Sequence, residues 1–189
     1  MSLNESNRLT LNTGKTKEIV FRCPQVKYFH MPPATDCIEQ VNCCKLLGVF
    51  FQSSLKMDSH VQYILSQCAQ RMYILKLLRS HGMPIVQLST VAYCLIISRI
   101  LYALPAWGGF ISTEHHHKVN AFLNELNPMD THTHIITIDE LISESTRDLF
   151  NKMCVPSHCL NRLLPDYRAV CNNLRLRGHG FQLPAHSSV

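Results

Sequence analysis

The histidines are the residue type in this chain most able to do chemistry, and metal coordination is the first chemistry that the 11 of them suggest. His115, His116 and His117 are consecutive, so on a helix their side chains point about 100° apart and do not converge on one ion. His132 and His134 would face one side of a strand, but they lack a Cys or carboxylate at ligand spacing. The histidines therefore predict solvated or capping side chains rather than a metal site.

Cysteine and histidine also occur together near the C-terminal end, in a mixed cluster made by Cys154, His158, Cys159 and Cys171. Their spacing is not that of a zinc finger, and buried structural side chains in an apolar helix explain it better. The chain has nine cysteines, an odd number at irregular spacing, which is typical of reduced thiols rather than of a disulfide framework. We expect neither a bound metal ion nor a disulfide.

Motifs for catalysis are missing from the sequence. It has no GxSxG nucleophile elbow, no glycine-rich phosphate loop and no HExxH motif. Two-metal phosphoryl transfer needs paired carboxylates around ions roughly 4 Å apart. The chain has no Asp-Asp pair, and its adjacent acidic pair, Asp139-Glu140, lies in an acidic segment. The sequence predicts no self-sufficient active site, no catalytic residue and no cofactor of its own.

Charge is distributed unevenly along the chain, whose formal net charge is +5. Residues 1–113 hold eleven Lys and Arg against five Asp and Glu, residues 114–148 are acidic, and residues 149–189 are basic again. This asymmetry permits a polyanionic partner such as nucleic acid for the front part, and a solvated basic face would give the same pattern. With 46% hydrophobic and 16% charged residues, the composition excludes a disordered or collagen-like chain.

Neither a membrane span nor a secretory signal is predicted. The longest unbroken apolar run, residues 91–97, is far shorter than the roughly 20 residues that a bilayer span needs. Residues 1–14 are polar and have no apolar core of the kind that a signal peptide has. We therefore expect an intracellular protein, in the cytoplasm or the nucleus, without a membrane partner.

The elements that must position any site begin with a short β-rich region. Residues 16–22 have a β-branched and aromatic centre, and residues 41–52 form a second apolar run in which Gly48 indicates a bulge or a close backbone approach. The proline-containing stretch 26–36 between them indicates a loop. The first 55 residues thus predict a small antiparallel β unit, which needs a neighbour because two or three strands alone are marginally stable.

A long amphipathic helix is predicted next, from Asp58 as N-cap to a stop at Gly82. Its apolar residues recur with helical period on one face, at Val61, Ile64, Leu65, Cys68, Met72 and Leu75. Its second half also carries Tyr73, Ile74 and Leu77 on the opposite side, so it is apolar nearly all round and must be enclosed.

Further helices follow in the second half of the chain. One is predicted from Pro84, as its first residue, to Pro105, and its almost uniformly apolar middle makes it the expected central helix of a bundle. A turn at Gly108-Gly109 and a helix over 114–126 come next. The sequence changes character near 126–131, where we expect a domain edge, and it continues with an acidic amphipathic segment, 138–150, and a basic tail.

Five stretches of the sequence, taken together, carry a resemblance to a known family. They are LTLNTGKTKEIVF (9–21), KLLGVFFQSSLKMDSHVQYILSQCAQRMYILKLLRSHGM (45–83), IISRILYALPAWGGF (96–110), HCLNRLLP (158–165) and LRLRGHGFQLP (174–184). As an ordered set they resemble the reverse transcriptases of non-LTR retrotransposons of the jockey-like kind. The resemblance spans nearly the whole chain apart from residues 22–40 and 111–137.

The resemblance implies a fold of the α+β class that is mostly α. Residues 1–55 would be the end of the polymerase palm, a short antiparallel β unit. Residues 56–125 would be the helical thumb, and residues 126–189 a helical or irregular C-terminal tail. A thumb embraces the template–primer duplex by its shape and through phosphate contacts rather than by reading bases.

The resemblance also implies which side chains would bind nucleic acid. Lys15 takes the position of the motif lysine that follows the catalytic strand of the complete polymerase. The stretch around Leu47 and Gly48 resembles the hairpin that holds the primer end, where a glycine allows close backbone approach. The expected nucleic-acid-binding residues are Lys15, Lys45, Gly48, Lys56, Arg71, Lys76 and Arg79. Arg71 and Lys76 flank the apolar stripe, so they could lie at the edge of a groove and contact phosphate. The alternative is that their side chains extend along the apolar surface and keep their charges in water.

The departures from the family pattern are as informative as the matches. The fingers, the first catalytic Asp and the aromatic-x-Asp-Asp turn would all lie before Met1. The complete polymerase uses Mg²⁺, and the resemblance implies no cofactor for this fragment. The sequence therefore predicts a fragment of an RNA-directed DNA polymerase, without activity of its own and with residual affinity for an RNA–DNA template–primer. The alternative is a helical interaction module that self-associates through the apolar face of residues 41–55, left exposed at the palm edge.

Overall fold

The structure, a computed structural model, describes residues 12–22, 28–35, 38–126, 136–167 and Phe181. The chain divides into two compact units, Met1–Ile142 and Ser143–Val189, each taken by itself below. In the described residues, helices dominate over short strands, so the α+β, mostly α class is confirmed. The three-part division at 55/56 and 125/126 stays a prediction. Most of the sequence change near 126–131 lies outside the described residues, as do His132, His134, Cys171 and residues 1–11.

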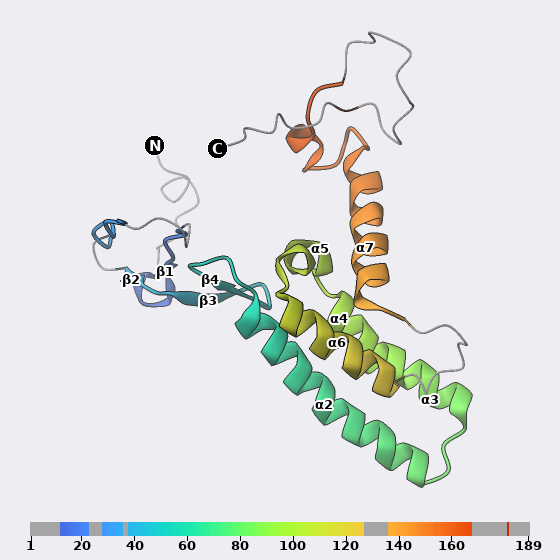
Figure 1. Cartoon of the computed structure of the whole chain (residues 1–189). Coiled ribbons are helices and arrows are strands. Elements are labelled where there is room, and N and C mark those ends of the chain that lie inside the picture. The colour runs from blue at the N-terminus through green and yellow to red at the C-terminus, as the bar shows by residue number, and fades with distance from the viewer. Residues whose placement is uncertain (1–11, 23–27, 36–37, 127–135, 168–180, 182–189) are drawn as a thin grey trace. The chain divides into compact units, whose positions relative to one another are not determined.

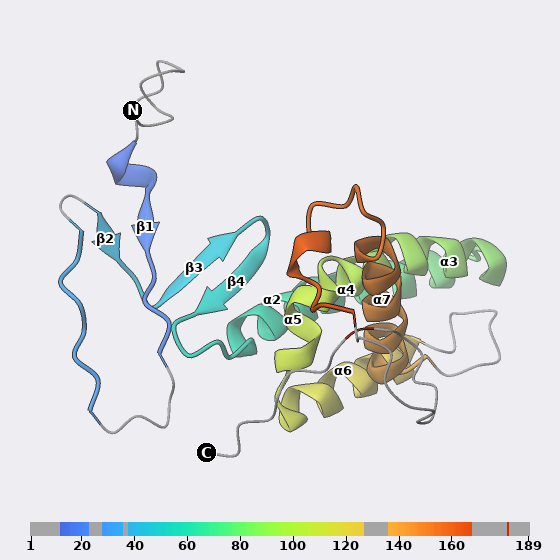
Figure 2. The same cartoon turned by 90° about the horizontal axis from the view of Figure 1, so that it is seen from above.

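The N-terminal β region differs from the expected antiparallel unit. The 3-10 turn η1 (Thr13–Lys15) leads into β1 (Lys17–Glu18), which pairs in parallel with β2 (Glu39–Gln40). Parallel neighbours need a long connection, and residues 19–38 supply it. The strand expected over 16–22 is thus only two residues long, and the antiparallel expectation is wrong for this pair. Figure 2 shows these two strands beside the β3–β4 hairpin.

The hairpin is formed by β3 (Cys43–Leu46) and β4 (Val49–Gln52), which pair antiparallel in regular register, with Leu46 opposite Val49. The two residues between the strands both have positive φ, 47° at Leu47 and 88° at Gly48. Because the strands pair residue for residue, Gly48 lies in a two-residue turn, and of the two alternatives expected there the bulge is ruled out. The right-handed twist of paired strands favours turns of this handedness, which glycine adopts without a steric penalty.

The long helix α2 spans Asp58–Ser80, close to the predicted bounds. Its predicted stripe is confirmed, because every member is buried except Leu65, which is partly buried. Met57 rather than Asp58 is the N-cap, and it makes no side-chain capping bond. The Asp58 carboxylate does not cap the helix but contacts Nδ1 of His115, a residue of another helix, at 3.0 Å.

The second half of α2 is not enclosed, contrary to the sequence prediction. Tyr73 is 70% exposed, and Ile74 and Leu77 are each 46% exposed. The partners of α2 in the described part of the chain are β4, α3, the segments after α3, and α6, and they cover one side of it. An apolar face thus stays open to solvent along this half of the helix.

The next helical run is the one expected to be central, and it is interrupted. It consists of α3 (Ile85–Ala92), a π-helical segment (Tyr93–Ile97) and α4 (Ser98–Leu101), with Pro84 as N-cap. It ends before Pro105, because Ala103 adopts a left-handed conformation with φ 53°. Its inner face is buried, but Val86 and Tyr93 are more than half exposed, so the run is covered on one side only.

This run also bears on the membrane expectation. By length and composition alone, the stretch Ile85–Phe110 is long and apolar enough to cross a membrane. The sequence argument missed it because it counted only unbroken apolar residues. The core helix of a soluble protein passes the same test, and Leu88, Ile96 and Ile100 are fully buried here. The absence of a membrane partner stays a prediction.

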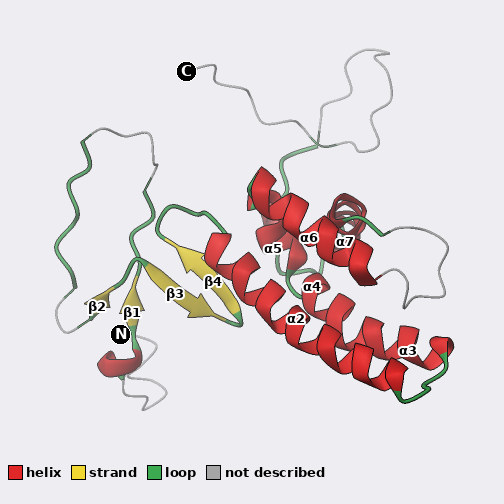
Figure 3. Cartoon of the chain, turned by 60° about the horizontal axis from the view of Figure 1, so that its bottom comes forward, coloured by secondary structure: helices red, strands yellow, loops and turns green. Residues whose placement is uncertain are grey.

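Two short elements and a longer helix complete the first unit's bundle. In place of the turn expected at Gly108-Gly109, the chain forms α5 (Leu104–Trp107) and the 3-10 turn η3 (Gly108–Phe110). The helix α6 (Thr113–Leu126) follows the prediction closely. Figures 1 and 3 show α6 and the α3–α4 run lying along α2.

The core of the first unit lies where these helices meet the hairpin. Its fully buried large side chains include Leu75 of α2, Leu88 and Ile100 of the interrupted run, and Trp107 of α5. The Trp107 indole Nε1 donates to the Tyr102 carbonyl at 3.0 Å, so its one polar group is satisfied. This core fixes the position of the residues around Tyr102 and, through them, the site described below.

The helix α7 (Ile138–Met153) agrees with the acidic amphipathic segment predicted over 138–150. Within the first unit, the Asn120 side chain of α6 accepts the Ile138 backbone N–H at 2.9 Å. The second unit continues into the 3-10 turn η5 (Asn161–Leu163), and Phe181 is buried against Phe150 with ring centroids 5.9 Å apart.

Candidate nucleic-acid interface

The tip of the β3–β4 hairpin is held against the end of α4. The Tyr102 hydroxyl donates to the Leu47 carbonyl at 2.8 Å. A Cβ atom added to Gly48 would lie 3.3 Å from Cε1 of Tyr102, which is tighter than an ordinary van der Waals contact. The close approach expected at Gly48 is therefore present, and the ring of Tyr102 makes it.

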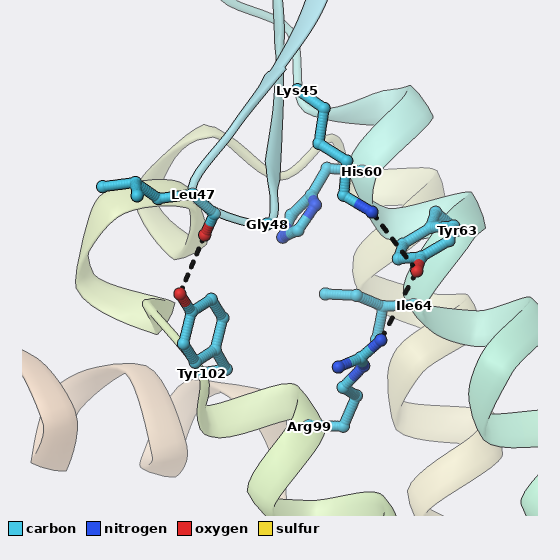
Figure 4. A pocket seen from close by; sticks show the side chains of 8 residues that line it. All are labelled: Lys45, Leu47, Gly48, His60, Tyr63, Ile64, Arg99 and Tyr102. Atoms are coloured by element: carbon cyan, nitrogen blue, oxygen red, sulfur yellow. Dashed lines mark hydrogen bonds between the residues drawn. The ribbon is translucent and has the colours of Figure 1, made fainter.

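A cavity of about 260 Å³ opens between this hairpin and the helices. Its floor includes His60 and Ile64 of α2, which are 2% and 4% exposed, and its rim includes the exposed side chains of Leu47 and Tyr102. Among the described residues, the lining consists of Lys45, Leu47, Gly48, His60, Tyr63, Ile64, Arg99 and Tyr102. We call this set the hairpin pocket; Figure 4 shows it.

Two cations meet one hydroxyl in the hairpin pocket. The Lys45 Nζ and the Arg99 Nη2 each donate to the Tyr63 Oη at 3.4 Å, and Figure 4 shows them approaching it from opposite sides. Lys45 also lies 4.5 Å from the centre of the Tyr63 ring. The hydrogen bond from Lys45 is the main cause that lowers the pKa of Tyr63. These two hydrogen bonds are long and therefore weak.

None of the described residues that line the hairpin pocket is a carboxylate. Three lysines elsewhere in the described part of the chain form ion pairs with carboxylates: Lys17 with Glu39, Lys76 with Glu125, and Lys118 with Glu114. Within the described residues, neither Lys45 nor Arg99 has a carboxylate at ion-pair distance. The pocket therefore carries an uncompensated positive charge.

His60 forms the floor as a neutral ring. Its Nδ1 accepts the Phe50 backbone N–H at 3.4 Å, and its ring stands edge-to-face with Trp107 at 5.1 Å. Burial, with Lys45 and Arg99 as further causes, lowers the pKa of His60 to about 4. The imidazole therefore adds no charge at neutral pH, and the charge of the pocket is that of Lys45 and Arg99.

The structure brings together two of the seven residues predicted to bind nucleic acid. Lys45 and Gly48 share the hairpin pocket, with Tyr63, Arg99, His60 and Tyr102, which the sequence argument did not single out. No local sequence pattern distinguishes these four additional residues of the pocket. The resemblance stretches did contain all of them, because they lie within 45–83 and 96–110.

The other five predicted residues lie apart from the hairpin pocket. Lys15 ends η1 and is exposed. Lys76 is held by Glu125 at 2.6 Å, and Arg79 is exposed near the end of α2. Arg71 is partly buried, and its Nη1 has no hydrogen-bond partner.

Lys56 lines a second cavity, of about 610 Å³, which also contains Asp58, Ser112 and His115. A serine, a histidine and an aspartate together suggest a hydrolase triad, so their geometry matters. The Ser112 Oγ and the Asp58 Oδ1 both approach the same ring nitrogen of His115, Nδ1, at 2.8 and 3.0 Å. A triad needs the two partners on opposite nitrogens, and here Nε2 is buried without a partner. The cluster joins the starts of α2 and α6 and has no geometry for nucleophilic catalysis.

The described residues contain no group of three or more His, Cys, Asp or Glu placed to hold a metal ion. The consecutive histidines diverge, since His116 contacts Asp139 at 2.8 Å and His117 is exposed. His115 is buried, so the expectation of a solvated side chain is wrong for it. Every cysteine within the described ranges is a free thiol. Cys154 and Cys159 are exposed and lie in turns after α7, so the expectation of buried structural side chains in an apolar helix is wrong for them. Burial raises the pKa of the Cys68 thiol to about 11, so that one is unreactive.

The chain was compared with protein-family models, with curated proteins and with solved structures. None of the three comparisons found a match. The functional argument therefore rests on the residues and their geometry.

Proposed function

We propose that this chain is the palm-edge and thumb part of a non-LTR retrotransposon reverse transcriptase, and that it binds an RNA–DNA template–primer without catalysing polymerisation. The single observation that carries the binding is the hairpin pocket, where Lys45 and Arg99 converge without an acidic partner. The 189 residues have no Asp-Asp pair to hold the metal ions of a polymerase. The polymerase assignment is supported by the sequence resemblance.

The position of the pocket also supports nucleic-acid binding. A basic group on a strand and another on a helix, with a glycine turn between them, form a concave surface that a phosphate backbone can approach closely. Tyr63 and Tyr102 add hydroxyl groups that can donate to phosphate or sugar oxygens. The site recognises the sugar-phosphate backbone rather than the bases, as a thumb does.

The test is a fluorescence-anisotropy titration with a labelled RNA–DNA duplex at several salt concentrations. Each phosphate contact contributes about −0.9 to the slope of log affinity against log salt. We expect the double variant Lys45→Gln/Arg99→Gln to reduce the magnitude of that slope by about 2. The matched control is Lys118→Gln, a lysine of α6 that pairs with Glu114, and it should leave the slope unchanged. Absence of binding at low salt would contradict the proposal.

A second function is favoured by the hairpin tip itself. Leu46 and Leu47 are 60% and 83% exposed, so the turn presents apolar surface to solvent. We propose self-association through this tip as the alternative to nucleic-acid binding. Sedimentation equilibrium tests it, because Leu47→Lys should shift a dimer to monomer. A wild-type protein that stays monomeric at high concentration would exclude this alternative.

A further inference from the structure

We propose that the hairpin pocket binds a phosphomonoester, the terminal phosphate of a nucleic-acid strand, in preference to an internal phosphodiester. This inference rests on the proposed nucleic-acid binding and names the group that the pocket takes. The charge of the pocket, its size and the long hydrogen bonds of its two cations support it.

The charge of the pocket matches a terminal phosphate. Lys45 and Arg99 supply two positive charges, His60 is neutral, and none of the described lining residues is a carboxylate. A phosphomonoester carries about −1.5 to −2 at neutral pH, whereas an internal phosphodiester carries one negative charge. A diester therefore matches one of the two positive charges, and a monoester matches both.

The size of the pocket suits a small group. Its lining includes the buried side chains of His60 and Ile64 and the exposed side chains of Leu47 and Tyr102. The volume, about 260 Å³, is just below the roughly 300–1,000 Å³ of sites that hold whole drug-sized ligands. One phosphate and part of its sugar fit this space better than a complete nucleotide.

The contacts of the two cations leave room for a better acceptor. The Tyr63 hydroxyl is the shared acceptor of Lys45 and Arg99, and both distances are 3.4 Å. An ionised phosphate oxygen makes charge-assisted hydrogen bonds, typically of 2.7–2.9 Å, which are about twice as strong as neutral ones. A phosphate between the two cations would therefore replace two long contacts with short ones, and Tyr63 could then donate to it.

The experiment compares three internally labelled oligonucleotides of one sequence, with a 5′-phosphate, a 3′-phosphate or no terminal phosphate, on the full chain. Because hydrogen bonds to charged groups are stronger than neutral ones, we expect at least about tenfold tighter binding of one phosphorylated end. The ratio of affinities, phosphorylated to unphosphorylated, is the readout. It should fall to about 1 in Lys45→Gln and in Arg99→Gln, and it should stay unchanged in Lys118→Gln.

Competition identifies the source of the phosphomonoester. If AMP displaces the phosphorylated oligonucleotide and adenosine does not, the pocket recognises the monoester itself; if only the phosphorylated oligonucleotide competes, it recognises a strand end. Both results support the site. Lys45 is exposed, so its variant tests the pocket without disturbing the core. Equal affinity for all three oligonucleotides would overturn the terminal-phosphate inference and leave the proposed function standing, whereas no binding of any of them would overturn both.

Discussion

Replacing Gly48 by alanine tests how the hairpin tip is held over the pocket. Gly48 has a φ of 88°, in the left-handed region, and its missing Cβ would lie 3.3 Å from the Tyr102 ring. The variant therefore meets two separate penalties. One is the backbone conformation, and the other is displacement of Tyr102, whose hydroxyl binds the Leu47 carbonyl.

The two penalties can be estimated. A left-handed conformation costs an L-residue about 1–2 kcal/mol, and reduced freedom of the unfolded chain offsets about 0.4–1 kcal/mol of it. Displacing Tyr102 by a few tenths of an ångström weakens its hydrogen bond, which contributes about 0.5–1.5 kcal/mol. We expect Gly48→Ala to lower the free energy of unfolding by about 2 kcal/mol.

Gly82 is the matched control, because its φ is 83° but no atom lies within 4 Å of its missing Cβ. Gly82→Ala meets only the backbone penalty, so we expect a loss of about 1 kcal/mol. Urea denaturation followed by circular dichroism measures both variants. In a Tyr102→Ala background, Gly48→Ala should become no more costly than Gly82→Ala.

Two results would refute this reasoning. Equal losses for Gly48→Ala and Gly82→Ala in the otherwise unchanged protein would mean that the Tyr102 contact contributes nothing to the hairpin tip. A neutral Gly48→Ala variant would mean that the turn does not require positive φ at this residue.

Three further predictions concern the turn, the floor of the pocket and the core. Leu47→Asn should raise the free energy of unfolding by about 1 kcal/mol in urea titration, because Asn tolerates the φ of 47° better than Leu. Because the pKa of His60 is lowered from 6.5 to about 4, the unfolded state binds the proton more tightly. The free energy of unfolding should fall as pH drops from 6.5 to 4, by up to about 3 kcal/mol, and His60→Leu should abolish that part when the two proteins are compared by thermal unfolding. Leu88→Ala, at a fully buried position, should cost about 2–5 kcal/mol in chemical denaturation, and a loss below 1 kcal/mol would mean that the α2–α3 contact is not part of the core.

The helices were the most predictable part of the fold, because their signals are local. The period of apolar residues placed α2 over Asp58–Ser80, and the glycine turn and Pro128 on either side placed α6 over Thr113–Leu126, each within about two residues. The sequence also indicated a special backbone at Gly48. It could not distinguish a bulge from a turn, because that depends on which residues pair across the hairpin.

Exposure was less predictable than helix formation. Tyr73, Ile74 and Leu77 were expected to be enclosed because the helix is apolar nearly all round there, yet all three are exposed. Periodicity describes one helix at a time, whereas burial depends on how many neighbours pack around it. The left-handed turn at Ala103, which ends the interrupted run before Pro105, likewise has no signal in the residue type.

For the candidate site, too, some features follow from the sequence alone and others depend on the tertiary structure. The sequence by itself determined that the chain is mostly helical, basic toward its front and without catalytic motifs, because these follow from residue types and their spacing. Only the tertiary structure decided that Lys45, Tyr63 and Arg99 meet. They belong to a strand and two different helices, and Arg99 lies 36 positions from Tyr63 in the sequence. Docking of the hairpin against α2 and α4 brings them together, and no local pattern encodes that contact.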